Sequence, residues 1–252
     1  AVDPSQLNTT QGLSVTWLGH ATVLLNSAGV RVLTDPLFSE RASPVSWLGP
    51  KRLTALPVDP ARLPFVDAVV ISHNHYDHLD LPSLRLLNAQ AGGPPLFIVP
   101  LGNAALLRGE GITQVKELDW WDSIAIRDGM RITLVPTQHW SKRRLFGDRN
   151  EALWGGYVLQ HQGRQAFFAG DTGYGPHFAD IRERLGAPRL ALLPIGAYEP
   201  RWFMGPVHMD PDDAVRAHVD LGARRSLSIH FNTFQLTDEA IEQPVLDLQE
   251  AL

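Results

Sequence analysis

The sequence predicts an α/β domain in which two β-sheets pack together and are covered by helices. Short apolar runs alternate with helical segments along the chain, and turn residues between many of the runs suit antiparallel hairpins. The 252 residues are 44% hydrophobic, which is enough to bury one substantial core. No repeat or low-complexity linker divides the chain, so we expect one domain over residues 1–252.

Strand-like runs come first along the chain. Two turn sequences, Gly19-His20 and Ala28-Gly29, separate the strands predicted at Leu13–Leu18, Ala21–Asn26 and Val30–Thr34. Residues 36–64 are rich in Pro, with scattered Trp and Arg, which is typical of an ordered loop lying on the body of the protein. The continuous apolar run Val66–Ser72 predicts a strand buried on both faces, and a helix is predicted next, over Leu81–Ala91.

The rest of the chain continues the alternation. Further strands are predicted at Leu96–Val99, Ser123–Arg127, Arg131–Pro136, Gly156–Gln160, Ala166–Ala169, Leu190–Pro194 and Ser226–His230. Asp210 followed by Pro211 is the pattern of an N-cap with Pro in the first turn, so a helix is predicted from Pro211 to Leu221. The chain does not begin with Met and ends within the amphipathic stretch Pro244–Leu252, so we expect the natural protein to be longer.

Composition excludes several classes of function. Charged residues make up 19% of the chain and the formal net charge is −5, whereas a nucleic-acid surface needs clustered Lys and Arg over a basic background, so we expect no nucleic-acid partner. There is no Cys, which excludes disulfides and thiolate metal sites. No apolar run approaches the roughly 20 residues that cross a bilayer. We therefore expect a soluble chain, cytoplasmic or peripheral to a membrane, and the sequence leaves its oligomeric state open.

The strongest chemical signal is a His-rich segment that directly follows the strand at Val66–Ser72. Three His and one Asp fall within six residues, at His73, His75, Asp77 and His78. In an extended segment, residues two apart point the same way, so His73 and His75 can hold one metal ion together. If the chain then turns, Asp77 and His78 reach a second position beside the first. A polar surface loop rich in His is the alternative, and the specific spacing disfavours it.

Three further metal-type side chains stand at or just beyond the ends of predicted strands. They are His139, Asp171 and His230. Taken singly, each histidine would more often be a hydrogen-bonded core residue, and the Gly-Asp-Thr-Gly around Asp171 would more often be a turn. Because strand ends converge at one edge of a sheet, the three side chains and the His-rich segment together predict a single metal centre.

These motifs resemble a known family. His-x-His-x-Asp-His, then a His, a Gly-Asp and a late His is the metal signature of the metallo-β-lactamase superfamily, and the closer resemblance is to its N-acylphosphatidylethanolamine-hydrolysing phospholipase D group. It runs from about residue 13 to 244, over segments that include Trp17–Val23, Thr34–Pro36, Arg41–Pro44, Gly49–Arg52, Ile71–Asp80, Glu117–Trp121, Gln138–Trp140, Ala152–Gly155, Phe168–Tyr174, Pro194–Met204 and His208–Asp213.

The resemblance implies a metallo-β-lactamase αββα sandwich, two mixed β-sheets flanked by helices, with two Zn²⁺ ions at one edge. The implied ligands of the first zinc are His73, His75 and His139, and those of the second are Asp77, His78 and His230. Asp171 would bridge the two ions, with a hydroxide as the other bridge, and two zinc ions in such a site lie about 3.5–4 Å apart. Asp35 would orient a ligand histidine through its other ring nitrogen.

The activity implied is that of a zinc-dependent phosphodiesterase of the phospholipase D type, acting on N-acylphosphatidylethanolamine or a related glycerophospholipid. The expected catalytic residues are Asp77, Asp171 and His208, and the expected contacts to substrate are Arg201, Trp202, Phe203 and Met204. The apolar members of the second set could instead complete the core. A lactonase or amidohydrolase on the same fold is the first alternative, and an inactive binding module is the second.

The remaining polar candidates are expected to have supporting roles. His20 is expected to be structural or to lie behind the ligands, and His161, His177 and His218 to occupy ordinary surface or helix positions. A basic run such as Lys142-Arg143-Arg144 is usually a solvated face, and here it is also expected to attract an anionic head group near the zinc ions.

Overall fold

Two six-stranded sheets pack face to face in the computed structural model, which describes residues 2–8 and 12–252. The first sheet has strand order β1-β2-β3-β4-β5-β6, with bounds Leu13–Gly19, Thr22–Ser27, Val30–Thr34, Ala68–Val70, Leu96–Pro100 and Val115–Leu118. Strands β1, β2 and β3 follow one another as antiparallel hairpins. Strands β3, β4, β5 and β6 each pair in parallel with the next. The sheet is therefore mixed, as expected.

The second sheet is also mixed and has strand order β12-β11-β10-β9-β8-β7. In chain order from β7, its strands span Ser123–Ala125, Arg131–Val135, Gly156–His161, Arg164–Phe168, Leu190–Pro194 and Ser226–Ile229. Strands β7 to β10 pair in antiparallel fashion, whereas β10, β11 and β12 are parallel. Parallel pairing places the ends of β10 and β12 at the same edge of the sheet, which later carries two of the predicted ligands.

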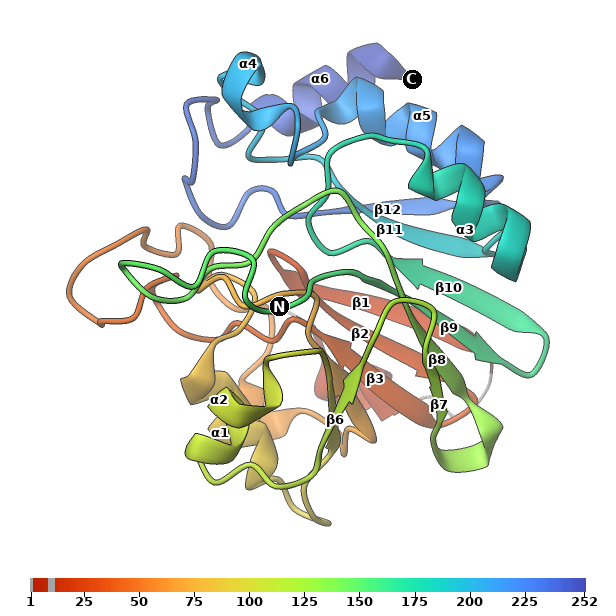
Figure 1. Cartoon of the computed structure of the whole chain (residues 1–252). Coiled ribbons are helices and arrows are strands. Elements are labelled where there is room, and N and C mark those ends of the chain that lie inside the picture. Colours follow the sequence, from red (N-terminus) through yellow and green to blue (C-terminus); the bar gives the residue numbers. More distant parts are fainter. Residues whose placement is uncertain (1, 9–11) are drawn as a thin grey trace.

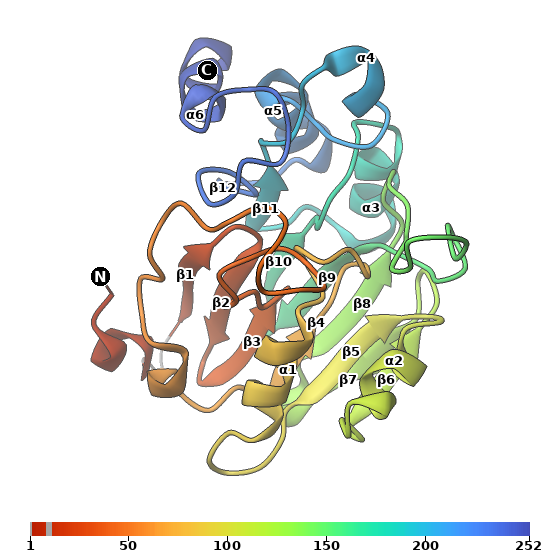
Figure 2. The same ribbon diagram turned by 90° about the vertical axis from the view of Figure 1, so that its left-hand side faces the viewer.

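Helices cover the two outer faces (Figure 1). The six α-helices of the described residues are α1 Leu81–Asn88, α2 Ala104–Gly109, α3 His177–Leu185, α4 Arg201–Met204, α5 Pro211–Leu221 and α6 Gln243–Ala251. Helices α1 and α2 pack on the first sheet, and α3 and α5 pack on the second, while α6 lies against α5. Figure 2 shows the same separation, with α1 and α2 far from α4, α5 and α6. The predicted αββα arrangement is confirmed.

The core between the sheets is largely apolar and includes the hydroxyl of Tyr157. Val70 and Ile98 of the first sheet pack against residues of the second such as Phe168. Tyr157 of β9 is fully buried, and its hydroxyl donates to the carbonyl oxygens of Ile71, at 2.9 Å, and Ile98, at 3.2 Å. This side chain thus ties the second sheet to the end of β4, directly before the His-rich segment.

Several elements differ from the sequence prediction. Strand β6 and helices α2, α3 and α4 were not predicted: α2 and α4 are six and four residues long, too short to show a helical period. Strand β4 is shorter than the predicted run Val66–Ser72, whose two end residues bond side chains instead of a neighbouring strand. The Val66 N–H donates to Gln90 and the Ser72 N–H to Asp35. No helix of the described residues is long and apolar enough to cross a membrane.

Replacing Tyr157 by Phe should lower the free energy of unfolding by about 1–3 kcal/mol, because the buried carbonyl groups lose their donor. Urea denaturation followed by circular dichroism measures this loss. Tyr174→Phe is the matched control, since the Tyr174 hydroxyl bonds only the carboxylate of Asp220 near the surface. Equal stability losses in the two variants would contradict the role assigned to Tyr157.

Candidate metal centre

Four strand ends meet at one edge of the sandwich and bring the sequence-predicted ligands together. The segment His73–His78 follows β4 of the first sheet, and the second sheet supplies His139 after β8, Asp171 after β10 and His230 after β12. The two sheets approach closely here at Gly170, whose φ is 63°. A Cβ at Gly170 would lie 2.5 Å from the Cβ of Ser72, so only glycine permits this contact.

The first group of ligand atoms belongs to His73, His75 and His139, whose atoms all lie within 4.8 Å of one another. Nδ1 of His75 lies 2.9 Å from Nε2 of His73 and 3.3 Å from Nε2 of His139. The other ring nitrogen of His139 donates to the carbonyl oxygen of Val207 at 3.0 Å, which leaves Nε2 as the free lone pair facing the group.

The second group is centred on the carboxylate of Asp77. Its Oδ2 atom lies 3.2 Å from Nε2 of His78 and 3.3 Å from Nε2 of His230. His20 joins this group, with Nε2 at 3.0 Å from the same oxygen. The sequence predicted a structural role for His20 or a position behind the ligands, whereas the structure places it among them. Its position directly after β1 is the sequence signal that could have identified it.

Asp171 lies between the two groups. Oδ2 is 3.9 Å from Nε2 of both His73 and His139, which belong to the first group. The same oxygen is 3.1 Å from Nε2 of His78, and Oδ1 is 3.2 Å from Nε2 of His230, which belong to the second. One buried carboxylate therefore faces both sets of ring nitrogens, as a bridging ligand must.

Asp35 supports the ligands from behind. Its fully buried carboxylate accepts from the Ser72 N–H at 2.7 Å, from the Ser72 hydroxyl at 2.5 Å and from Nδ1 of His78 at 2.6 Å. The Ser72 hydroxyl oxygen also lies 2.9 Å from Nδ1 of His73. Because Nδ1 of His78 is used in this way, its Nε2 points into the centre. The structure thus places Asp35 where the sequence expected it, against a candidate ligand.

Burial and charge act in opposite directions on the histidines of the centre, while the carboxylates stay ionised. Burial lowers the pKa of His75 to about 4 and that of His139 to about 3. Burial alone would raise the pKa of the Asp171 carboxyl, but neighbouring His230 and His78 hold it well below its usual range. Burial disfavours the charged form of His230 too, yet the Asp171 and Asp77 carboxylates raise its pKa to about 9. These carboxylates therefore demand positive charge inside the centre.

The donor set fits divalent metal ions. Nε2 of His78 and Oδ1 of Asp171 are buried with no aligned hydrogen-bond partner among the described residues, although ring nitrogens and carboxylates lie about them at contact distance. Two lone-pair nitrogens as close as those of His73 and His75 also call for a shared proton or cation. Imidazole nitrogen and carboxylate oxygen are the ligands that zinc and similar ions take in proteins without cysteine.

His208 reaches the centre from the segment between α4 and α5. It is buried, and its Nδ1 lies 4.0 Å from Oδ2 of Asp171 with no hydrogen-bond partner. Arg201 holds this segment in place, because its guanidinium donates to the His208 carbonyl oxygen at 2.9 Å and to Asp213 at 2.7 Å. It also pairs with Asp210 at 3.0 Å. The structure thus gives Arg201 partners within the protein, and its predicted contact to substrate stays a prediction.

The three neighbours of Arg201 in the predicted substrate set stand on α4. Trp202 and Phe203 are 83% and 62% exposed, whereas Met204 is half-buried. The alternative that these two aromatic rings complete the core is therefore excluded.

Arg143 of the basic run Lys142–Arg144 clamps the His-rich segment, so this part of the run is not a solvated face. Its guanidinium donates to the carbonyl oxygens of Leu79, at 2.7 Å, and Asn74, at 3.2 Å, and stacks 4.0 Å from the ring centroid of Tyr76.

Two other histidines differ from the expectation that they occupy ordinary surface positions. His161 is buried at the end of β9, where its Nδ1 lies 3.0 Å from the hydroxyl of Ser27. His177 begins α3, as a helix position, but it is also buried, with Nε2 at 3.1 Å from the hydroxyl of Thr172. The partner of His161 lies 134 residues away, which no local pattern could reveal, whereas that of His177 lies only five residues earlier.

Comparison with known proteins gives one matching family model, described as "Beta-lactamase superfamily domain", over residues 30–231. The chain is 44% identical to an "uncharacterized protein" of Mycobacterium tuberculosis, over 92% of this chain and 62% of that protein. It is 41% identical to N-acyl-phosphatidylethanolamine-hydrolyzing phospholipase D 1 of Caenorhabditis elegans, over 96% of this chain and 70% of the relative. An isothiocyanate hydrolase from Delia radicum gut bacteria superposes with a TM-score of 0.72 and 24% identity, covering 94% of this chain and 93% of that one.

Asp35→Asn should weaken metal binding about 10- to 100-fold, the usual cost of losing a partner that orients a ligand. An amide cannot accept all three hydrogen bonds that now converge on the Asp35 carboxylate. Competition with a chelating dye measures the affinity, with Asp212→Asn on the exposed face of α5 as the matched control. Affinity equal to that of the control would show that Asp35 does not position the ligands.

Proposed function

Since the chain belongs to the beta-lactamase superfamily, we propose that it is a binuclear zinc-dependent phosphodiesterase of the phospholipase D type. Its substrate would be N-acylphosphatidylethanolamine or a related glycerophospholipid, the class named for the relative from Caenorhabditis elegans. The observation that carries the proposal is the placement of Asp171 between two groups of buried ligand atoms. A lone metal ion would leave one of these groups without a cation.

Each of the two groups of ligand atoms would hold one zinc ion. The first site would use His73, His75 and His139, the second Asp77, His78 and His230, and both would share Asp171. A bound zinc pair supplies Lewis acidity toward a phosphoryl oxygen. It also lowers the pKa of zinc-bound water, so that hydroxide is available at neutral pH. The protein holds the ligands rigidly through partners such as Asp35 and Val207, and buried walls exclude bulk solvent from most of the centre.

His208 is proposed to act on the substrate. It stands beside Asp171 but outside the two ligand groups of the proposal, with an unpartnered ring nitrogen. Burial lowers its pKa to about 3, so the imidazole is neutral and can donate one hydrogen bond. A donor at this place can stabilise the negative charge that develops on a phosphoryl or leaving-group oxygen. Asp77 and Asp171 are proposed to act in catalysis as ligands of the zinc ions.

Exposed apolar side chains around the centre support a lipid substrate and a peripheral membrane contact. They come in three pairs on three segments: Trp47 and Leu48, Leu145 and Phe146, and Trp202 and Phe203. All but one of the six are at least 62% exposed, and Leu48 is 60% exposed. Figure 1 shows that the loops carrying the first two pairs project on one side of the sandwich, with α4 above them. We call these six residues the apolar rim.

The apolar rim is anchored to the metal centre. Lys142 N–H donates to the Asn74 side chain at 2.9 Å, so the loop that carries Leu145 is tied to the His-rich segment. The loop that carries Trp47 is tied to the same region, since the Ser39 hydroxyl donates to Asp80 at 2.8 Å. A bilayer that accepts the rim would therefore present its head groups to the centre. Each methylene that leaves water contributes about 0.8 kcal/mol, so affinity should rise with acyl-chain length.

His208→Ala should leave zinc content near two ions per chain while lowering turnover by at least about tenfold, the low end for a lost charge-stabilising donor. Elemental analysis and phosphodiester hydrolysis measure the two quantities. His218→Ala on α5, whose ring bonds only Ser226, is the matched control. Loss of zinc from the His208 variant, or turnover equal to that of the control, would remove His208 from the catalytic residues.

The substrate class is tested by comparing kcat/KM for long- and short-chain phospholipids, a small aryl phosphodiester, a lactone and a β-lactam. We expect the long-chain phospholipid to be the best substrate and the β-lactam to show only trace turnover. Trp202→Ser combined with Phe203→Ser should reduce hydrolysis of the long-chain lipid more than that of the short-chain one, whereas Leu86→Ser on α1 should not. A lactone preferred over every phosphodiester would replace the phospholipase proposal by the lactonase alternative.

A further inference from the structure

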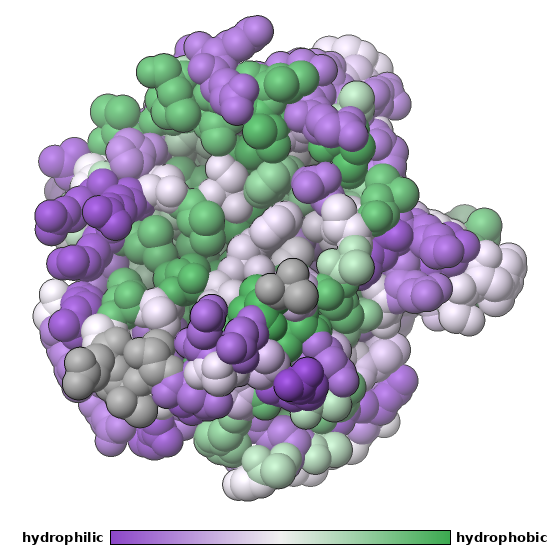
Figure 3. Space-filling view, turned by 180° about the vertical axis from the view of Figure 1, so that it is seen from behind, coloured by the Kyte–Doolittle hydropathy of each residue, from purple (hydrophilic) through white to green (hydrophobic). Residues whose placement is uncertain are grey.

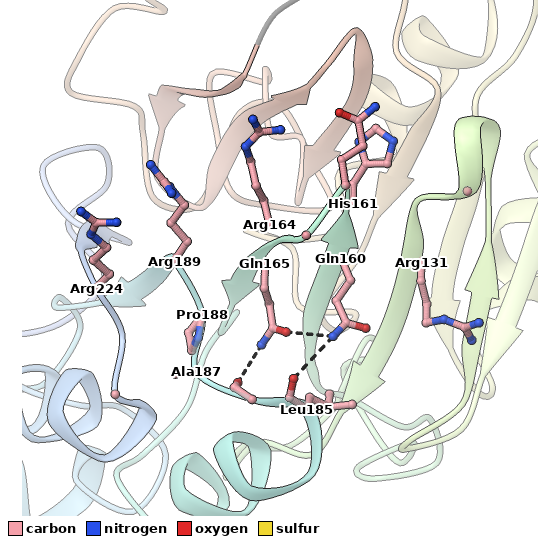
Figure 4. Close-up of a pocket in the computed structure, with 15 residues that line it drawn as sticks. Arg131, Gln160, His161, Arg164, Gln165, Leu185, Ala187, Pro188, Arg189 and Arg224 are labelled. Carbon is pink, nitrogen blue, oxygen red and sulfur yellow. Dashed lines mark hydrogen bonds between the residues drawn. The ribbon is translucent and has the colours of Figure 1, made fainter.

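A cavity of about 660 Å³ opens at the end of the second sheet that lies away from the metal centre. Its walls are the β9–β10 turn, the turn that follows α3 and the loop that precedes β12 (Figure 4). The length of β10 gives the distance between this cavity and the metal centre. Arg164 begins β10 and Asp171 lies seven residues further on, so at about 3.3 Å per residue the two residues are roughly 23 Å apart.

Four arginines line this cavity, and each stands at the start of a strand. Arg131 begins β8, Arg164 begins β10, Arg189 directly precedes β11, and Arg224 stands two residues before β12. Because β10, β11 and β12 are parallel, their starts lie at one edge of the sheet. Figure 4 shows Arg164, Arg189 and Arg224 side by side and pointing the same way. In Figure 3, hydrophilic side chains gather along the left-hand edge, the side on which the β9–β10 turn lies.

The positive charge of these arginines is not neutralised by the described residues. No Asp or Glu lines the cavity. Among the described residues, Arg164, Arg189 and Arg224 form no ion pair and donate no side-chain hydrogen bond, and Arg131 bonds only the Ser123 hydroxyl, at 2.8 Å. Figure 4 shows Arg131 beyond Gln160 and pointing away from the other three, so the neighbouring guanidinium groups are those of Arg164, Arg189 and Arg224. Three neighbouring guanidinium groups without a lining carboxylate favour a bound anion.

Hydrogen bonds fix the backbone around the arginines. Nε2 of Gln160 donates to Oε1 of Gln165 at 2.8 Å, and Nε2 of Gln165 donates to the Gly186 carbonyl oxygen at 2.8 Å. The backbone N–H of Arg189 donates to Gln165 at 2.9 Å, and that of Arg224 donates to Pro188 at 3.1 Å. The backbone positions of the arginines are therefore fixed, and only their side chains need to adapt to a ligand.

We propose that this arginine cavity binds, through Arg164, Arg189 and Arg224, a small soluble anion that carries several phosphoryl charges. Guanidinium groups pair with phosphate oxygens in bidentate fashion, and several phosphoryl groups are needed to satisfy several arginines. The volume lies within the range of small-molecule sites, roughly 300–1,000 Å³. A phospholipid head group offers the same chemistry, but a bilayer against the apolar rim lies at the other end of the sheet. The proposal does not depend on the reaction at the metal centre.

Isothermal titration of the zinc-loaded protein with inorganic triphosphate at low ionic strength tests the proposal. We expect saturable binding at one site, weakened at least about tenfold when Arg189→Gln and Arg224→Gln are combined, because charge-assisted contacts are lost. The matched control combines Arg62→Gln and Arg108→Gln, two exposed arginines beside the first sheet, and should bind as the parent does. Equal affinities of the two double variants, or no saturable binding by the parent, would overturn the proposal.

Two further measurements distinguish binding in the arginine cavity from binding of triphosphate to zinc and from binding of lipid head groups. Triphosphate also complexes zinc, so the titration is repeated on Asp171→Asn, where we expect the affinity of the arginine cavity to be retained. Binding lost in Asp171→Asn but retained in the arginine variant would place the ligand at the metal centre and overturn the proposal. Flotation with phosphatidylglycerol vesicles tests the lipid source: vesicle binding that depends on Arg189 and Arg224, without triphosphate binding, would overturn the assignment of a soluble ligand.

Discussion

The carboxylate of Asp171 is the interaction on which the rest of the centre depends. It is buried and lies within 4.0 Å of a ring nitrogen of five histidines, His73, His78, His139, His208 and His230. An ionised carboxylate without a cation costs several kcal/mol in such a place. The fold satisfies this demand by bringing strand ends of both sheets to one edge, and Gly170 and Tyr157 fix how closely the sheets approach there. Loss of either contact would move ligands relative to one another.

Much of this arrangement could be predicted because an apolar run followed by a polar residue marks the end of a strand in the sequence. The apolar runs before His139, Asp171 and His230 mark strands β8, β10 and β12, which run in the same direction and therefore end at one edge of the sheet. The resemblance based on the His-rich segment is confirmed by the family match over residues 30–231, and the mixed sheets are confirmed by the pairing of their strands. Whether each named side chain binds metal stays a prediction.

Other features depend on contacts between distant residues, which a single sequence does not display. His161 is buried because it meets Ser27, 134 residues earlier, and His20 faces Asp77, 57 residues later. Positive φ angles at His20, Asp35 and His230 hold these residues in a conformation that costs of order 1–3 kcal/mol each, and only the surrounding structure can enforce it. The arginine cavity likewise arises from strand register: its arginines are scattered over nearly a hundred residues and form no basic run.

The central claim is that one carboxylate joins two metal sites, and anomalous X-ray diffraction from zinc-loaded crystals at the zinc absorption edge tests it most directly. The account predicts two anomalous peaks about 3.5–4 Å apart on either side of Asp171. One should lie among His73, His75 and His139, and the other among Asp77, His78 and His230. A single peak, or peaks only at surface histidines such as His218, would contradict it.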